Sequence, residues 1–316
     1  MVRNSQREKP RFDLNWSDHI SRSSRLCVFV GAGISKGCST PSGLVPLAWD
    51  DLIAELARKF GCESEATDAR LDLLERAEII ERTRRSYGVS DASFADEVAR
   101  LVDQIDGELV SESNLYPTLR DVGPELIITT NYDRIIERYL NGSTEPGYNV
   151  WTYPGRVEQL VPSSYCSTSD RLGDFIRSGE PLIAKIHGGV RDTALVDSAT
   201  AGVIDDTDLD LVFSFSSYQK AYSAESEIPA ALRAIFATYQ VVFIGYSLRD
   251  HVLRDILQGA GSLKGDRFKH VILQSPESVV PESYREAFQE SYGVVVGTYS
   301  DHSFLSASLH AIMLSR

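Results

Sequence analysis

Cysteine is scarce in this chain of 316 residues, which contains only Cys27, Cys38, Cys62 and Cys166. No two of them form a C-x-x-C pair, so a zinc ribbon is not supported. So few cysteines in a chain of this length indicate reduced thiols, as in the cytoplasm. We therefore expect a cytoplasmic protein without a bound metal.

Long apolar runs are absent as well. No stretch approaches the ~18 consecutive apolar residues that a membrane-spanning helix requires, so no membrane association is expected. Residues 1–24 are polar and lack the apolar core of a signal peptide, and we expect them to form an N-terminal arm.

Positive charge is in deficit, because 32 lysines and arginines stand against 45 acidic residues and leave a net charge of −13. The phosphate backbone repels such a chain, so direct binding of nucleic acid is not expected. The length is sufficient to bury a sizeable core, either as one large α/β domain or as two smaller ones.

Several nearly continuous apolar runs predict buried strands. They lie at residues 26–30, 125–130, 181–189, 211–216, 240–247, 269–274 and 292–299, the last as an edge strand. Strands that are apolar throughout are typical of a parallel sheet covered by helices on both faces. Their alternation with helical segments predicts an α/β fold with a doubly wound, mostly parallel, Rossmann-like sheet.

Helical spacing of apolar residues is clearest at 49–60, 68–88 and 91–105. This block is too long for a single crossover between the first two strands, so we expect an inserted helical subdomain at about 49–120. A second insertion, at about 141–180, is rich in Ser, Gly, Pro and Tyr and is expected to be irregular.

The segment VFVGAGISKG leads an apolar run into Gly31, Ala32 and Gly33, and Ser35 follows two residues later. Glycines at a strand-to-helix turn let the backbone approach a pyrophosphate, whose charge the helix N-terminus favours. A full G-x-G-x-x-G motif needs a third glycine at the position of Lys36. The turn is therefore either a nucleotide cradle or a tight turn made for packing.

The segment IITTNYD ends a second apolar run with Asn131 and Asp133. Ligands of open α/β sheets bind beyond the carboxyl ends of the strands, so both side chains are expected at that edge. The alternative is a cap for the following helix, but a cap needs only one polar side chain. Two uncharged or acidic side chains here could hold a ligand without a permanent positive charge nearby.

His187 in IAKIHGGV, and Gly245 and Ser247 in VVFIGYSLRD, also follow apolar runs. Histidine is well suited to proton transfer near neutral pH, although a lone histidine is more often structural. We interpret Asp250 as a cap for the helix after the last motif. Four such strand ends in this order are far more specific together than any one of them.

This ordered set resembles the sirtuin family and, more closely, its bacterial sirtuin-like NAD-hydrolase branch of antiphage defence. The matching segments are GAGIS (31–35), TTNYD (129–133), KIHGG (185–189) and FIGYSLRD (243–250). True deacetylases carry Gln before the Asn, Gly-Thr-Ser in place of Gly-Tyr-Ser, and a four-cysteine zinc module that this chain lacks. The resemblance therefore implies a sirtuin-type NAD-binding catalytic domain over 25–316, with NAD cleavage rather than deacetylation.

The residues that the resemblance implies for NAD binding are Gly31, Ala32, Gly33, Ser35, Asp133, Gly245 and Ser247. The first four would hold the pyrophosphate, Asp133 the nicotinamide carboxamide, and the last two would line the adenosine side. Asn131 would orient water and the nicotinamide ribose, and His187 would be the base. Gln274 and Ser275 are the local candidates for the adenosine ribose.

The implied activity is that of an NAD glycohydrolase, which uses NAD as a substrate and needs no metal. Because NAD depletion is toxic, the activity is expected to be gated, as in an abortive-infection effector of antiviral defence. The family implies a homo-oligomer, or a complex with a ring-forming ATPase of the HerA type. NAD-dependent deacylation or ADP-ribosylation, and a non-catalytic sensor of NAD or ADP-ribose, stay open as alternatives.

Overall fold

The structure is a computed structural model. It describes residues 25–37, 47–103, 115–141, 147–158, 171–190, 211–248, 250–264, 270–274, 282–299 and 304–315. The expected N-terminal arm at 1–24 and Ser275 lie outside these residues.

Within the described residues, eight strands form one sheet in the order β4-β3-β5-β2-β1-β6-β7-β8. The strands are β1 (Arg25–Val30), β2 (Leu126–Thr129), β3 (Asn149–Thr152), β4 (Arg156–Glu158), β5 (Leu182–Lys185), β6 (Tyr239–Ile244), β7 (His270–Gln274) and β8 (Val294–Thr298). Neighbouring strands are parallel except β3 and β4, which form an antiparallel pair at one edge. The chain winds outward from β1 in both directions, so the expected doubly wound, mostly parallel α/β sheet is confirmed.

β1 lies inside the sheet and pairs with β2 on one side and β6 on the other. Successive residues of a strand point to opposite faces. Cys27 and Phe29 belong to the apolar cluster on one face, whereas Val28 and Val30 belong to the cluster on the other. Burial on both faces explains the continuous apolar runs, and the winding reverses at β1, so a ligand crevice is expected at its carboxyl end.

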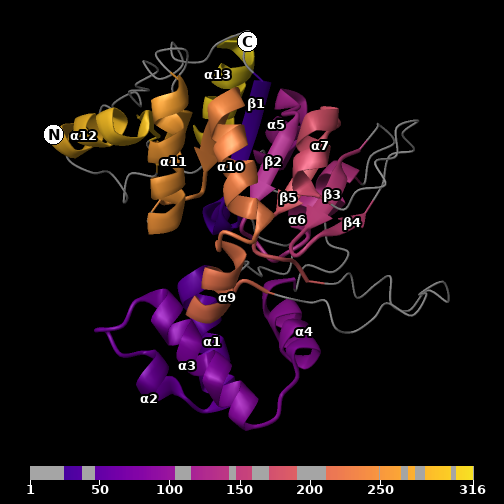
Figure 1. Ribbon diagram of the computed structural model, residues 1–316, viewed down its shortest axis with the longest axis vertical. Helices are drawn as coiled ribbons and strands as arrows, with labels where there is room; N and C mark the ends of the chain where they lie inside the picture. The colour runs from indigo at the N-terminus through magenta and orange to yellow at the C-terminus, as the bar shows by residue number, and fades with distance from the viewer. Residues whose placement is uncertain are drawn as a thin grey trace, which may run out of the picture.

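Helices cover both faces of this sheet, as Figure 1 shows. The helices of the described residues, including those that do not cover the sheet, are η2 (Ala32–Gly37, a 3₁₀ helix), α1 (Trp49–Phe60), α2 (Glu63–Ala66), α3 (Leu73–Ser86), α4 (Asp91–Val102), α5 (Leu115–Val122), α6 (Ile135–Asn141), α7 (Leu172–Ser178), α9 (Phe215–Ala221), α10 (Glu227–Thr238), α11 (His251–Lys264), α12 (Glu282–Tyr292) and α13 (Phe304–Ser315). Side chains of α7, α10 and α11 pack in the cluster on one face, and those of α5, α6 and α13 in the cluster on the other.

The helices α1 to α4 build a separate unit below the sheet in the view of Figure 1. Their apolar side chains form a third cluster, which Tyr132, Val190 and Phe213 complete from loops beyond the strands. α5 instead packs on the sheet with α6 and α13. The helical block expected at about 49–120 is thus divided, with α1 to α4 standing apart and α5 belonging to the sheet layers.

Two segments differ from the sequence-based expectation. The strand expected at 211–216 is wrong, because residues 211–213 are not part of the sheet and Ser214 caps α9 by accepting from the Ser217 backbone N–H. The stretch at about 141–180, expected to be irregular, contains β3, β4 and α7. β3 pairs with β5 along all of its four residues, so its partner in the sheet defines it rather than a local apolar run.

In the described part of the chain, no helix combines the length and the apolar character needed to cross a membrane. Among the same residues, no group of three or more His, Cys, Asp or Glu side chains is placed to hold a metal ion.

Candidate functional site

The turn from β1 into η2 lies directly against the turn that leaves β6. The Gly31 N–H donates to the Ile244 carbonyl oxygen at 3.0 Å, and the Gly33 N–H donates to that of Gly245 at 2.9 Å. A Cβ atom on Gly33 would stand 2.7 Å from the Cα of Gly245, closer than side chains allow. Close packing of two backbones therefore requires these glycines, whatever else the turn binds.

The other residues expected at the cradle lie at the same carboxyl edge. Ala32 begins η2 and is partly buried, and Ser35 lies within the same helix. Gly245 has a φ of 61°, a left-handed conformation that favours glycine. Ser247, two residues beyond, is exposed.

Asn131 connects the second motif to the first. The residue follows β2, is 7% exposed, and receives support from the Thr129 hydroxyl, which accepts its backbone N–H at 3.0 Å. Its side-chain amide donates to the Gly31 carbonyl oxygen at 3.4 Å. Two motifs that are 100 residues apart along the chain are therefore in contact.

Asp133 behaves as a helix cap. It is buried, and its carboxylate accepts a hydrogen bond from the Ile135 backbone N–H at 3.1 Å, at the start of α6. Burial raises the pKa of Asp133 to about 6, because the charged form loses water, and the Lys185 ammonium opposes this rise. The helix cap that the sequence left open as an alternative for this motif is therefore Asp133 and not Asn131.

A buried lysine lies beneath this loop. Lys185 ends β5, is 2% exposed, donates to the Asp133 carbonyl oxygen, and pairs with Glu137 at 2.6 Å. Gly189 leaves room for it, since a Cβ there would meet the Lys185 Cε at 2.5 Å. The expectation that no permanent positive charge lies near the loop is therefore wrong, although the Glu137 carboxylate balances the charge.

His187 follows β5 and is held from two directions. Its carbonyl oxygen accepts from the Val212 N–H at 2.9 Å, and its Nε2 lies 2.9 Å from the Tyr222 hydroxyl oxygen. The Tyr218 and Tyr222 rings stand edge-on to the imidazole, each at a centroid distance of 5.9 Å. Burial lowers the pKa of His187 to about 4, because the imidazolium loses water, and the charge of Asp250 opposes this fall. The imidazole is therefore neutral at pH 7, and burial makes it a weaker base than an exposed histidine.

Asp250 joins the tyrosines of α9 to the glycine turn. Its carboxylate accepts from the Tyr218 hydroxyl and, at a longer 3.4 Å, from the Tyr246 hydroxyl. The Tyr246 ring packs on the turn, with its Cδ2 only 2.8 Å from where a Cβ on Gly31 would stand. Asp250 also accepts from the Leu253 backbone N–H at 3.1 Å, so it caps α11 as expected.

These contacts bring most of the predicted site residues together. One series runs from Asn131 to the Gly31 turn and on through Tyr246 and Asp250, and the two tyrosines of α9 continue it to His187. It lies at the carboxyl edge of the sheet, where open α/β folds bind ligands. Among the described contacts, Ser247 and Gln274 are not part of this series.

Sequence reasoning missed Lys185, Tyr218 and Tyr222. The lysine gives a readable signal, because it places a charge inside the apolar run LIAKI. The two tyrosines have the i, i+4 spacing that puts side chains on one face of a helix, but no local feature relates them to His187. Their role depends on how α9 packs against the turn after β5.

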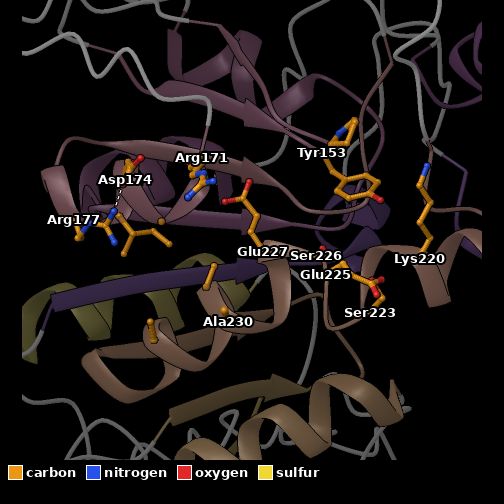
Figure 2. Close-up of a pocket in the computed structure, with 15 residues that line it drawn as sticks. Tyr153, Arg171, Asp174, Arg177, Lys220, Ser223, Glu225, Ser226, Glu227 and Ala230 are labelled. Atoms are coloured by element: carbon orange, nitrogen blue, oxygen red, sulfur yellow. Dashed lines mark hydrogen bonds and ion pairs between the residues drawn. The ribbon is translucent and has the colours of Figure 1, made fainter.

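A cavity of about 900 Å³ opens beside α7 and α10 (Figure 2). Four of its charged side chains lie close to one another, since Arg177 pairs with Asp174 and the Arg171 guanidinium faces the Glu227 carboxylate. Glu227 also caps α7 by accepting a backbone N–H at 2.9 Å. Ser223, which follows Tyr222, also lines the cavity, and Glu227 connects α10 to the start of α7.

Comparison with known families gives a match. The family model described as a SIR2-like domain matches residues 125–296, just over half of the chain. The matched segment starts just before β2, reaches into β8 and contains the TTNYD, KIHGG and GYSLRD segments, whereas the β1 turn precedes it. No curated protein matches the chain.

Proposed function

The chain belongs to the SIR2-like domain family, and we propose that it is an NAD glycohydrolase. SIR2-like domains bind NAD, and the family indicates an NAD-related activity. The proposed reaction cleaves NAD with water to nicotinamide and ADP-ribose. One observation carries the proposal: the Asn131 amide touches the Gly31 turn, and a series of contacts leads from that turn to a neutral His187 imidazole.

The proposed binding roles fit the character of these residues. The N–H groups of Gly31 and Gly33 already donate to the end of β6 and to the turn after it, so these glycines would shape the cradle while Ala32 and Ser35 contact the pyrophosphate. Gly245 and Ser247, beyond β6, would line the adenosine side. Asp133 would accept from the N–H groups of the nicotinamide carboxamide while it caps α6.

The proposed chemistry needs no general acid at the leaving group. Nicotinamide carries a positive charge in NAD and departs neutral, because it takes the electron pair of the bond between its N1 and the ribose C1′. A water oxygen forms the new bond to C1′, and the water proton goes to His187, a role worth about 10²–10⁴-fold in rate. Asn131 would hold the water and a ribose hydroxyl, and its uncharged amide does not repel the cationic sugar centre.

The assignment of the two catalytic side chains is tested by substitution. Asn131→Ala and His187→Ala are each expected to lower kcat for NAD hydrolysis by at least about 10²-fold, because each removes a group that contacts the reacting atoms. Release of nicotinamide and ADP-ribose is followed by chromatography, and circular dichroism and urea unfolding check the fold. His310→Ala, at an exposed position of α13, is the control. Full turnover by either folded variant would contradict the assignment.

The same assay separates the proposed reaction from its alternatives. Nicotinamide release by the purified chain and NAD alone, with ADP-ribose as the product, supports hydrolysis. Release that requires an acetylated peptide supports deacylation, and a protein that gains mass supports ADP-ribosylation. Tight binding of NAD without any release supports a sensor.

We further propose that the enzyme is a gated toxic effector of antiphage defence and acts in the cytoplasm. The reasoning is chemical, since free hydrolysis of NAD would deplete a cofactor that the cell itself needs. The proposed gate is assembly, either as a homo-oligomer or with a ring-forming ATPase of the HerA type. A chain that is fully active as a monomer would contradict this form of gating.

A further inference from the structure

Lys185 connects the two segments that carry the proposed catalytic residues. It is the last residue of β5 and lies two positions before His187. Its ammonium donates to the backbone carbonyl oxygen of Asp133, in the TTNYD loop that also carries Asn131. The lysine is only 2% exposed, so this contact lies inside the protein. Lys185 is thus placed to fix one segment against the other.

The turn after β5 leaves space for the lysine side chain. Gly188 has a φ of 83°, a left-handed conformation that favours glycine, and its N–H donates to the Lys185 carbonyl oxygen at 3.3 Å. A Cβ atom on Gly189 would stand 2.5 Å from the Lys185 Cε, closer than side chains allow. Beyond these glycines, the Val190 N–H donates to the Tyr132 carbonyl oxygen at 3.0 Å. The turn therefore borders the lysine side chain and contacts the same loop.

Stability alone gives little reason for a lysine at this position. Its charge is balanced by Glu137 of α6, whose carboxylate lies 2.6 Å from the ammonium and is buried as well. Moving two charges out of water costs so much that an apolar pair of similar volume is often equally or more stabilising. The bond to the Asp133 carbonyl oxygen does give a reason, because no apolar side chain could donate it.

We propose that Lys185 is a positioning residue, which holds the TTNYD loop through the Asp133 backbone and keeps a positive charge beside the Asp133 side chain. In the proposed reaction it thereby sets the orientation of Asn131 and favours the carboxylate form of Asp133, which accepts from the nicotinamide carboxamide. These catalytic consequences rest on the proposed function, whereas the hold on the loop does not.

Charged groups from three elements surround the Asp133 carboxylate. Among the described residues they are Lys185 of β5, Glu137 of α6, Asp103 after α4 with its partner Arg138, and Arg134, the next residue in the chain. Burial raises the pKa of Asp133 to about 6, the Lys185 ammonium opposes this rise, and the Glu137 carboxylate adds to it less strongly. The two members of the ion pair thus act on Asp133 in opposite directions.

Two variants use this contrast. The uncharged-pair variant combines Lys185→Met with Glu137→Gln, so it loses the bond to the loop but leaves no unpaired charge buried. Glu137→Gln alone keeps that bond and removes only the carboxylate charge. The matched control combines Arg84→Met with Glu81→Gln, which removes an ion pair of α3 whose side chains are 4% and 8% exposed.

The hold on the loop is measured by amide hydrogen exchange, which reports local opening and needs no NAD. Peptides that cover residues 127–135 are expected to exchange about 10-fold faster in the uncharged-pair variant, as loss of a hydrogen bond from a charged group predicts. Glu137→Gln and the α3 control are expected to exchange as wild type does. Equal exchange in the uncharged-pair variant and wild type overturns the proposal.

The effect of the Lys185 charge on Asp133 is measured by urea unfolding, again without NAD. Asp133→Asn is added to wild type and to each variant, and its effect on stability is followed from pH 4 to pH 8. Without the Lys185 charge the folded Asp133 keeps its proton to a higher pH. The stability gained through Asp133→Asn is therefore expected to keep rising to a higher pH in the uncharged-pair variant and to level off at a lower pH in Glu137→Gln. Identical profiles, or shifts in the opposite directions, overturn the proposal.

Turnover of NAD gives a further readout that packing alone would not change. In the uncharged-pair variant, kcat/KM at pH 7 is expected to fall about 10- to 100-fold. The acid side of the kcat/KM profile is expected near pH 6, the pKa of Asp133, and should move to higher pH in the uncharged-pair variant and to lower pH in Glu137→Gln. Wild-type turnover by a folded uncharged-pair variant overturns the positioning role. A wild-type chain that never hydrolyses NAD overturns the proposed function instead, and exchange and unfolding still decide what Lys185 does to the loop.

Discussion

The buried carboxylate of Asp133 lowers the stability of the fold when it is ionised. Burial raises its pKa from 3.8 to about 6. Between these two values the folded protein keeps a proton that the unfolded chain has lost, so stability falls as the pH rises through this window. At pH 7 the ionised carboxylate therefore costs the fold about 3 kcal/mol relative to a neutral side chain.

Asp133→Asn is expected to remove this cost and to keep the bond from the Ile135 N–H, because an asparagine oxygen also caps a helix. The stability of the variant relative to wild type should therefore rise by about 3 kcal/mol between pH 4 and pH 7. Urea unfolding at several pH values measures this difference. Asp72→Asn, at the cap of α3, is the control for loss of a capping carboxylate. A difference that does not change with pH would contradict the account.

The Asp133 variant also bears on function. If the carboxylate binds the nicotinamide carboxamide, a more stable protein with weaker NAD binding is expected, since functional residues often reduce stability. Calorimetry with the variant measures the binding.

At the scale of elements, the turns that leave β1 and β6 are fixed by backbone contact. Gly245 combines a left-handed φ of 61° with a position where an added Cβ would meet the Gly33 carbonyl carbon at 2.6 Å. Gly61, at the end of α1, has a similar φ of 68° but open space around it. Substitution of Gly61 therefore tests the strain of a left-handed backbone alone, whereas substitution of Gly245 tests that strain together with the close approach of two backbones.

Gly61→Ala is expected to cost about 1–2 kcal/mol, the strain of a left-handed alanine. Gly245→Ala carries the same strain and also overpacks the turn, which adds about 1–3 kcal/mol or more. Urea unfolding of the two variants measures the difference. Equal destabilisation would show that the turns of β1 and β6 can move apart without cost.

Prediction from sequence succeeded for elements that are defined locally. β1 and β6 are continuous apolar runs, and the polar side chains that follow them had to lie at one edge of a parallel sheet. β3 was missed because four residues of NVWT carry no pattern apart from their partner β5. The tyrosines beside His187 were missed for the same reason, since only the packing of α9 gives them a role.

At the scale of the molecule, the unit of α1 to α4 rests on the loops of the site. Trp49 of α1 packs against Tyr132, with ring centroids 5.9 Å apart, and against Phe213 at 5.3 Å. Tyr132 directly follows Asn131. Phe213 directly follows Val212, whose backbone N–H donates to the His187 carbonyl oxygen. Movement of this unit would therefore reach both proposed catalytic residues, which makes it a natural place for a gate.

The net charge of −13 opposes association of identical copies, and salt screens that repulsion. The proposed homo-oligomer is therefore expected to be more populated at high than at low ionic strength. Size-exclusion chromatography with light scattering, run at both, measures the mass, and NAD turnover is recorded for each species. A monomer at both ionic strengths, with full activity, would contradict assembly as the gate.

The bare peptide contact between Gly33 and Gly245 limits how this fold can be re-engineered for another dinucleotide. No side chain separates Gly33 from Gly245, so this contact offers nothing to enlarge, shrink or recharge. Altered selectivity would therefore have to come from side chains elsewhere in the proposed site. Variant libraries aimed at those side chains should yield folded proteins far more often than libraries aimed at Gly33 and Gly245.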